Sequence, residues 1–206
     1  MARGVAGHPL ARSFYARDSR ELAPLLLNKV LVRGRGPDLV AARIVEVEAY
    51  AGTEDPGSHA YRGPTPRNQT MFGPPGHLYV YFTYGVHWCA NVVGGSVGVA
   101  SAVLLRGAAP TVGLEVMRSR RGPRRDRELC AGPGRLCEAF GITRAEDGAD
   151  LVRGVVRILD DGVPPPRRPK RSTRVGLAAG RGDAHRWRWF VDGDVNVSRA
   201  VRPSRR

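Results

Sequence analysis

The sequence predicts one domain of mixed α/β class. A length of 206 residues suits a single domain with short extensions. Stretches that alternate apolar and polar residues, as strands do, are interspersed with segments whose apolar residues recur at helical spacing. The hydrophobic share of 42% and the charged share of 25% are those of an ordinary globular protein with a substantial core.

The predicted elements follow one another as a helix, a hairpin, a long loop, a second hairpin, a strand, two helices and closing strands. A folded domain is expected over residues 14–198, between a flexible tail at 1–13 and a basic tail at 199–206. Within it we expect a helix after Asp18, strands at 27–32 and 39–50, a hairpin at 78–93, a strand at 99–105, helices at 111–121 and 132–140, and strands at 152–158, 174–177 and 187–191.

Local signals support each of these elements. Asp18 or Ser19 can cap the first helix, and a Gly- and Pro-containing turn at 34–38 separates the first two strands. Gly85 lies near the tip of an aromatic, β-branched hairpin, and Pro133 suits the first turn of its helix. The connection at 51–76 has no periodicity, and a loop this long in a compact domain is usually functional or disordered.

The strand at 39–50 carries acids on one of its two predicted faces. Alternation places Val45, Val47 and Ala49 on one face and Ile44, Glu46, Glu48 and Tyr50 on the other. Glu48 and Tyr50 should therefore point the same way.

The net charge of +14 and the isoelectric point near 11.0 indicate a polyanionic partner, and nucleic acid is the leading class. Nearly all of the basic residues are arginine, which suits bidentate phosphate contacts and stacking on bases. The alternative is that a GC-rich genome favours arginine codons and that the charge is a by-product.

Three cysteines at irregular spacing predict neither a disulfide framework nor a zinc site, so we expect no metal and a reducing cytoplasm. The first ten residues lack the apolar run of a signal peptide, and no window has the length of a membrane span.

A combination of residues between 43 and 91 carries the chemistry. A lone glutamate on a strand, a lone histidine in a loop or a tyrosine in a hairpin is usually structural. Together, however, Glu48 lies near tyrosines that can stack a base, and Tyr84 lies beside Gly85, where an aromatic could wedge between base pairs. In a strongly cationic protein, this combination suggests chemistry on a nucleobase extruded from DNA.

Several motifs, in order and with similar spacing over about residues 14–198, carry a resemblance to a known family. They are Val47-Glu48-Ala49-Tyr50, His59, Thr65-Pro66-Arg67-Asn68, Met71-Phe72, Leu78-Tyr79-Val80-Tyr81 with Tyr84-Gly85, Val103-Leu104-Leu105-Arg106, residues 113–118, residues 126–130 with Gly132-Pro133, Arg174-Val175-Gly176, Arg188-Trp189-Phe190 and Val197-Ser198. With these motifs the chain resembles the alkyladenine DNA glycosylases, also called methylpurine or 3-methyladenine DNA glycosylases. The resemblance implies a curved, largely antiparallel sheet with surrounding helices and a protruding β-hairpin.

The resemblance also implies roles for individual residues. Glu48 would activate the attacking water, with Arg106 and the backbone carbonyl of Val175 helping to hold it. The flipped base would lie between Tyr50, His59 and Tyr81, with Leu104 as an apolar contact. Asn91 would exclude guanine by colliding with the exocyclic amine of that base. Tyr84 would insert into the duplex, and the DNA backbone would be contacted by Thr65, Arg135 and Arg144. No cofactor is implied. Pro64 and His87-Trp88 depart from the family pattern, which affects the expected DNA footprint more than the chemistry.

The sequence thus predicts a monomeric, monofunctional purine DNA glycosylase that starts base excision repair. It would act on double-stranded DNA containing alkylated or deaminated purines such as 3-methyladenine, hypoxanthine and ethenoadenine. The first alternative is a non-catalytic nucleic-acid-binding module, for which the charge and the tyrosines would suffice. The second is another enzyme on the same scaffold, such as a formyltransferase-like domain.

Overall fold

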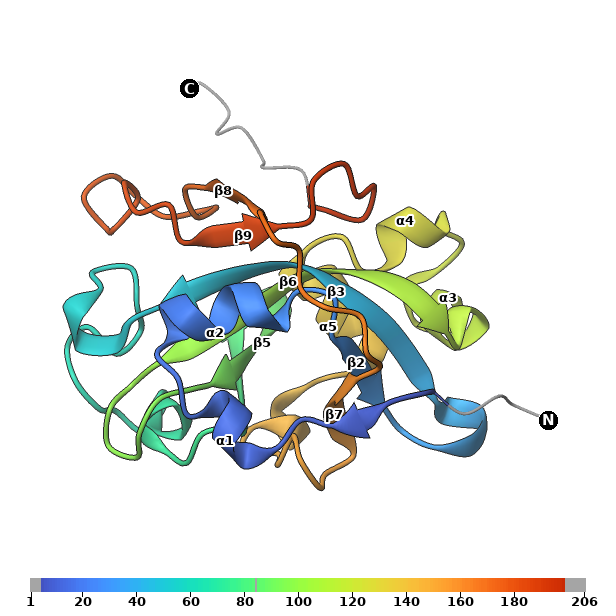
Figure 1. The fold of residues 1–206 in the computed structure, drawn as a ribbon, viewed down its shortest axis with the longest axis horizontal. Coiled ribbons are helices and arrows are strands. Elements are labelled where there is room, and N and C mark those ends of the chain that lie inside the picture. The colour runs from blue at the N-terminus through green and yellow to red at the C-terminus, as the bar shows by residue number, and fades with distance from the viewer. Residues whose placement is uncertain (1–4, 84, 199–206) are drawn as a thin grey trace.

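A curved sheet of nine strands forms the body of the protein. The computed structural model describes residues 5–83 and 85–198. The strand order is β1-β7-β2-β3-β6-β5-β4, with β9 added to the free part of β3 and β8 added to β9. Every pairing is antiparallel, and the sheet curls into a half-barrel (Figure 1). The expected mixed class and curved antiparallel sheet are confirmed.

Five short helices lie in two of the connections between the described strands, β1–β2 and β6–β7. The strands are β1 (His8–Pro9), β2 (Val30–Arg33), β3 (Val40–Tyr50), β4 (Leu78–Thr83), β5 (His87–Val93), β6 (Ala102–Val112), β7 (Val156–Asp160), β8 (Lys170–Ser172) and β9 (Arg188–Phe190). The helices are α1 (Arg12–Tyr15), α2 (Ser19–Leu26), α3 (Leu114–Arg121), α4 (Asp126–Leu129) and α5 (Pro133–Phe140), with short 3₁₀ turns at Gly36–Asp38, Gly52–Glu54, Gln69–Phe72 and Arg144–Glu146.

Two amphipathic helices, α2 and α5, pack on the sheet and share its main core. The Asp18 side chain accepts a hydrogen bond from the Arg20 amide at the start of α2, as the sequence predicts. Leu22 of α2 and Phe140 of α5 are fully buried in one cluster with the apolar residues of β3, β5 and β6. This packing makes β3 and β6, which carry the candidate chemistry, the best-supported strands of the sheet.

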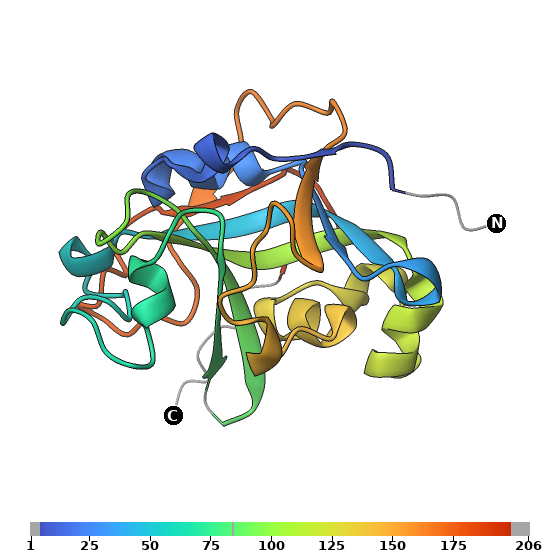
Figure 2. The ribbon, with the colours of Figure 1, turned by 90° about the horizontal axis from the view of Figure 1, so that it is seen from below.

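The predicted hairpin is confirmed and projects from the body of the molecule (Figure 2). Its strands pair Tyr79 with Asn91 and Tyr81 with Cys89. Because facing residues of a ladder point to the same side, the hairpin places tyrosines and an amide on one surface. Tyr84, predicted to insert into DNA, lies outside the described residues.

A β-bulge in β3 corrects the predicted alternation. Ile44 pairs with Ala108 and Glu46 with Gly107, so that Val45 is an extra residue in β3. Ile44 consequently belongs to the main core with Val47, not to the face of the two acids. The prediction for Glu46 and Glu48 holds because both follow the bulge.

Several predicted elements differ from the structure in their bounds or existence. Strand β6 extends to Val112, beyond the expected end at 105, and α3 starts only after Gly113, whose positive φ of 74° ends the strand. Residues 174–177 form a bend rather than a strand. Part of the predicted tail belongs to the fold, since His8 and Pro9 pair with β7 and Arg12 forms a 2.6 Å ion pair with Asp150.

Candidate active site

Glu48 lies fully buried in the middle of the sheet with three hydrogen-bond donors around its carboxylate. The Val175 amide donates to Oε1 at 2.8 Å, and the Tyr50 hydroxyl donates to Oε2 at 3.0 Å. Arg106 is more distant, with both of its closest approaches at 3.4 Å. The structure thus brings together Glu48, Tyr50, Arg106 and Val175, as expected, although Val175 contacts the acid through its amide.

Burial raises the pKa of Glu48 above its ordinary value. Arg106, the Val175 amide and the Tyr50 hydroxyl act in the opposite direction, and the nearby Glu46 charge adds to the rise. A carboxylate with a raised pKa is a stronger base than an exposed one, which suits proton abstraction near neutral pH.

Glu46 is a second buried acid, and sequence reasoning gave it no role. Its carboxylate accepts hydrogen bonds from Arg106 Nε at 3.0 Å and Arg188 Nε at 2.7 Å, and from the amide and hydroxyl of Ser198 at 2.6 and 2.8 Å. We call Glu46, Glu48, Arg106, Arg188 and Ser198 the Glu46 cluster. The sequence signal was the pair of acids two residues apart on one strand.

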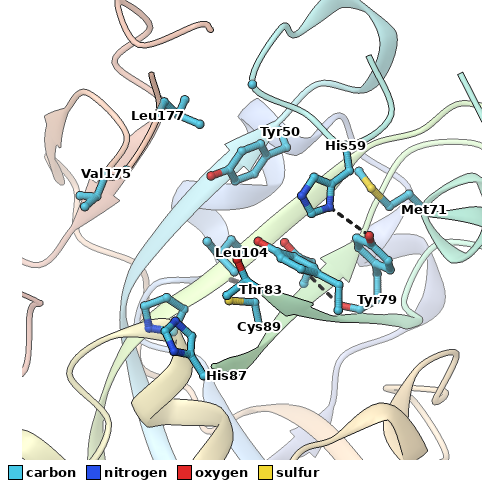
Figure 3. Close-up of a pocket in the computed structure, with 15 residues that line it drawn as sticks. Tyr50, His59, Met71, Tyr79, Thr83, His87, Cys89, Leu104, Val175 and Leu177 are labelled. Carbon is cyan, nitrogen blue, oxygen red and sulfur yellow. Dashed lines mark hydrogen bonds between the residues drawn. The ribbon is translucent and has the colours of Figure 1, made fainter. Parts of the chain in front are cut away.

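An aromatic pocket of about 190 Å³ is lined by Tyr50 and Val175, two partners of Glu48 (Figure 3). All five residues predicted for the base pocket line it: Tyr50, His59, Tyr81, Asn91 and Leu104. Val175 and Leu177 lie across the cavity from His59 and Tyr79 (Figure 3). Glu48 itself does not line the pocket, but its partners Tyr50 and Val175 do.

His59 and the hairpin tyrosines form one wall of this pocket. His59 Nδ1 lies 3.1 Å from the Tyr79 hydroxyl, and its ring meets that of Tyr81 edge-on with 4.3 Å between centroids. Desolvation lowers the pKa of His59, and the Arg67 charge lowers it further. A neutral imidazole beside tyrosine rings is an apolar surface with a polar edge, suited to stacking and orienting a base.

Asn91 lies at the pocket and also bonds its own hairpin. Its Nδ2 donates to the Tyr79 carbonyl at 3.1 Å, and the side chain is almost fully buried. Within residues 5–83 and 85–198, no donor is bonded to its Oδ1. The hairpin therefore holds the Asn91 side chain through its nitrogen. The amide oxygen can accept a hydrogen bond from a group in the pocket.

A second buried ion pair, between Asp55 and Arg174, holds two loops of the pocket together. Both side chains are fully buried, and Arg174 donates to the Asp55 oxygens at 2.5 and 2.6 Å. Arg174 also lies over the Tyr50 ring, 4.6 Å from its centroid, and donates to the Ala49 carbonyl. The pair fixes Tyr50 and the segment that supplies Val175, and sequence reasoning missed Asp55.

A larger groove of about 1380 Å³ meets the pocket at His87, Pro133 and Val175, which line both. Arg127, Arg135 and Arg106 line it from three elements, with Val86 and Trp88 from the hairpin. Its size and arginines suit a nucleic-acid backbone.

The three predicted backbone contacts lie on the surface. Arg135 is exposed in α5, Arg144 is exposed in the 3₁₀ turn after it, and Thr65 is exposed in the loop before β4. Arg135 lines the groove, whereas Arg144 and Thr65 do not. The Thr65 amide bonds the buried Asn68, which also bonds the His59 carbonyl, so this motif shapes the loop that carries His59.

In the part of the chain that the structure describes, no group of three His, Cys, Asp or Glu side chains could hold a metal ion. The same residues include no helix long and apolar enough to cross a membrane. All three cysteines are buried and unpaired as thiols.

Comparison with known proteins identifies the family. A family model described as methylpurine-DNA glycosylase matches residues 13–195, and the chain therefore belongs to that family. A Burkholderia cenocepacia protein is 53% identical over 198 residues, covering 95% of this chain and 93% of that protein. A Streptomyces avermitilis protein is 48% identical over 204 residues, covering 96% and 95%, and both carry the name "Putative 3-methyladenine DNA glycosylase".

Proposed function

We propose that the protein is a monofunctional DNA glycosylase that hydrolyses the N-glycosidic bond of alkylated or deaminated purines, including 3-methyladenine, hypoxanthine and ethenoadenine. The observation that carries this proposal is the position of Glu48. Its three partners line the cavities that a base and a DNA backbone would fill: Tyr50 the pocket, Arg106 the groove and Val175 both. Family membership supports the same activity.

The reaction assigns one step to the acid. As the bond from the sugar C1′ to the base nitrogen breaks, the electron pair leaves with the base and positive charge develops on the sugar. Glu48 takes a proton from a water molecule, whose oxygen then forms the new bond to C1′. The negative charge of Glu48 stabilises the positive charge that develops on the sugar before the proton is taken.

The pocket would select a base that has left the duplex. Unstacking costs a few kcal/mol and is least costly for a damaged or mispaired base. Tyr50, Tyr81 and His59 provide stacking surfaces, and Asn91 would disfavour the 2-amino group of guanine. Tyr84, which precedes Gly85 in the sequence, is proposed to fill the gap in the duplex. Thr65, Arg135 and Arg144 are proposed to contact the DNA backbone.

The absence of strand cleavage is part of the proposal, because a lyase step needs an amine to form a Schiff base. Neither lysine lines the pocket or the groove. Lys29 is buried in an ion pair with Asp160 at 2.8 Å, and Lys170 lies 3.5 Å from Asp192. We further propose that the enzyme acts as a monomer in the cytoplasm on double-stranded DNA.

The test uses duplexes with a single 3-methyladenine, hypoxanthine or ethenoadenine lesion and a matched undamaged duplex. We expect alkali-labile abasic sites at the lesion only, without strand breaks before alkali and without a covalent adduct after borohydride. Strand cleavage before alkali or a trapped adduct would show lyase activity. Absence of base release from every lesion would refute the glycosylase assignment.

One observation favours a second candidate, a nucleic-acid-binding module without catalysis. Glu48 has no exposed surface and does not itself line the pocket, as expected of a purely structural acid. This candidate predicts tight binding to lesion or abasic-analogue DNA with no base release. The assay above separates the two, because binding and product are measured on the same duplex.

A further inference from the structure

Glu46 occupies the centre of the buried charges beside Glu48. One of its carboxylate oxygens, Oε1, accepts three hydrogen bonds, from Arg106, Arg188 and the Ser198 hydroxyl. The other oxygen, Oε2, accepts a hydrogen bond from the Ser198 amide. Arg188 is fixed by further bonds to the Ser172 hydroxyl at 3.0 Å and to the Ser198 carbonyl at 3.1 Å. The Glu46 carboxylate is therefore held by two guanidinium groups.

Glu46 and Glu48 share Arg106 unequally. The Nε of Arg106 lies 3.0 Å from Glu46, whereas its closest approach to Glu48 is 3.4 Å. A guanidinium that pairs closely with a carboxylate makes that carboxylate a weak base. By taking the shorter bond, Glu46 keeps Arg106 near Glu48 without a close pair.

We propose that Glu46 is a positioning residue for base release: it anchors Arg106 and, with its own negative charge, keeps Glu48 basic enough to take a proton from water. The inference rests on the proposed glycosylase activity and assigns that activity a second acid. Glu46 contacts neither the pocket nor the groove, so it acts only through Arg106 and Glu48.

The charged and titratable groups around Glu48 come from every neighbouring element. They are Glu46 and Tyr50 from β3, Tyr81 from β4, Cys89 from β5, Arg106 from β6 and Arg174 from the segment after β8, with Arg188 of β9 behind Glu46. The tyrosines and the cysteine are neutral near pH 7, because burial raises their pKa values, that of Cys89 to about 11. The balance at Glu48 thus depends on the arginines and Glu46.

This arrangement predicts a signed change in the pH dependence of base release. Removing the Glu46 charge lowers the pKa of Glu48 and frees Arg106 to pair with it, so the rising limb of the rate should move to lower pH. Removing the Arg188 charge should move it to higher pH. A structural ion cluster predicts lost stability in both variants and no such opposite shifts.

The experiment measures single-turnover release of hypoxanthine between pH 5 and 9 with enzyme in excess over a lesion duplex. Glu46→Gln should be about tenfold slower at the plateau, which corresponds to one pKa unit, with its midpoint at lower pH. Arg188→Gln should shift the pH midpoint upward. This variant still tests the proposal if Glu46→Gln does not fold. Asp192→Asn, which removes a negative charge at the exposed pair with Lys170 outside the Glu46 cluster, should keep the wild-type midpoint.

If the wild type is active but the pH midpoints of Glu46→Gln and Arg188→Gln are unchanged, the proposed role of Glu46 is wrong. The proposed glycosylase activity would still stand. If the wild type released no base from this duplex or from those with 3-methyladenine and ethenoadenine, the proposed function itself would fail. Abasic-analogue binding within about threefold of wild type would confirm that the variants retain the DNA-binding fold.

Discussion

Two groups of buried charges, the Asp55–Arg174 pair and the Glu46 cluster, differ in how completely their charge is paired. In the Asp55–Arg174 pair, two guanidinium nitrogens contact two carboxylate oxygens, and the Ala51 and Gly57 amides complete the shell. In the Glu46 cluster, Glu46 is surrounded by close donors. Within residues 5–83 and 85–198, the donors to Glu48 are only the Val175 amide, the Tyr50 hydroxyl and a distant guanidinium.

This difference separates structural from chemical use of a buried acid. A carboxylate with a close bidentate arginine is strongly stabilised as an anion and has little tendency to take a proton. Glu48 is buried, and the donors around it do not fully replace the water that its charge has lost. Its pKa is therefore raised by burial. This difference supports the proposal that Glu48 transfers a proton, whereas Asp55 holds the pocket loops together.

The largest effect is expected on stability, from breaking the closed pair. Asp55→Asn leaves Arg174 buried without its counter-charge and should reduce the free energy of unfolding by about 3–5 kcal/mol. Urea unfolding measures the change. The matched control is Asp192→Asn at the exposed pair with Lys170, where we expect less than about 1 kcal/mol. Equal losses in the two variants would remove the distinction between buried and exposed pairs.

A smaller effect is expected on selectivity. Asn91→Ser shortens the side chain beside the pocket and should increase excision of 7-methylguanine relative to hypoxanthine by about tenfold. A tenfold change, about 1.4 kcal/mol, lies within the range of about 1–3 kcal/mol that an unpaired buried polar group costs. Both rates are measured in one duplex context. A purely structural amide, bonded to Tyr79, would instead give lower stability and an unchanged ratio.

The smallest effect is expected at the surface. Arg135→Gln and Arg144→Gln should each weaken DNA binding and reduce the salt dependence of log K by about 1, the value for one lost phosphate contact. The control is Arg35→Gln, an exposed arginine in the β2–β3 turn, at the opposite end of β3 from Tyr50. A slope that changes equally in all three variants would indicate general charge attraction without defined contacts.

Local patterns in the sequence predicted the elements that organise the site. Alternation gave β3 and the hairpin, and capping chemistry gave the start of α2. The predicted pocket residues meet at one cavity because Tyr81 and Asn91 lie on paired strands. Such features depend on neighbouring residues or on one turn, and a sequence carries them directly.

Features that depend on distant contacts could not be predicted. Asp55 and Arg174 are 119 residues apart, and no local pattern indicates their pairing. Residues 174–177 have the composition of a strand, but Arg174 is drawn toward Asp55 and Gly176 adopts a positive φ of 83°. The bulge at Val45 depends on the register with β6, so it reversed the face predicted for Ile44.

The central claim, that Glu48 is the base that activates water, is tested by comparing wild type with Glu48→Gln on one hypoxanthine duplex. Glutamine keeps the shape but cannot accept the proton at neutral pH. Single-turnover base release should fall by at least about 10²-fold, the scale of losing a general base, while binding to abasic-analogue DNA stays within about threefold of wild type. Near-normal base release by Glu48→Gln would contradict the account.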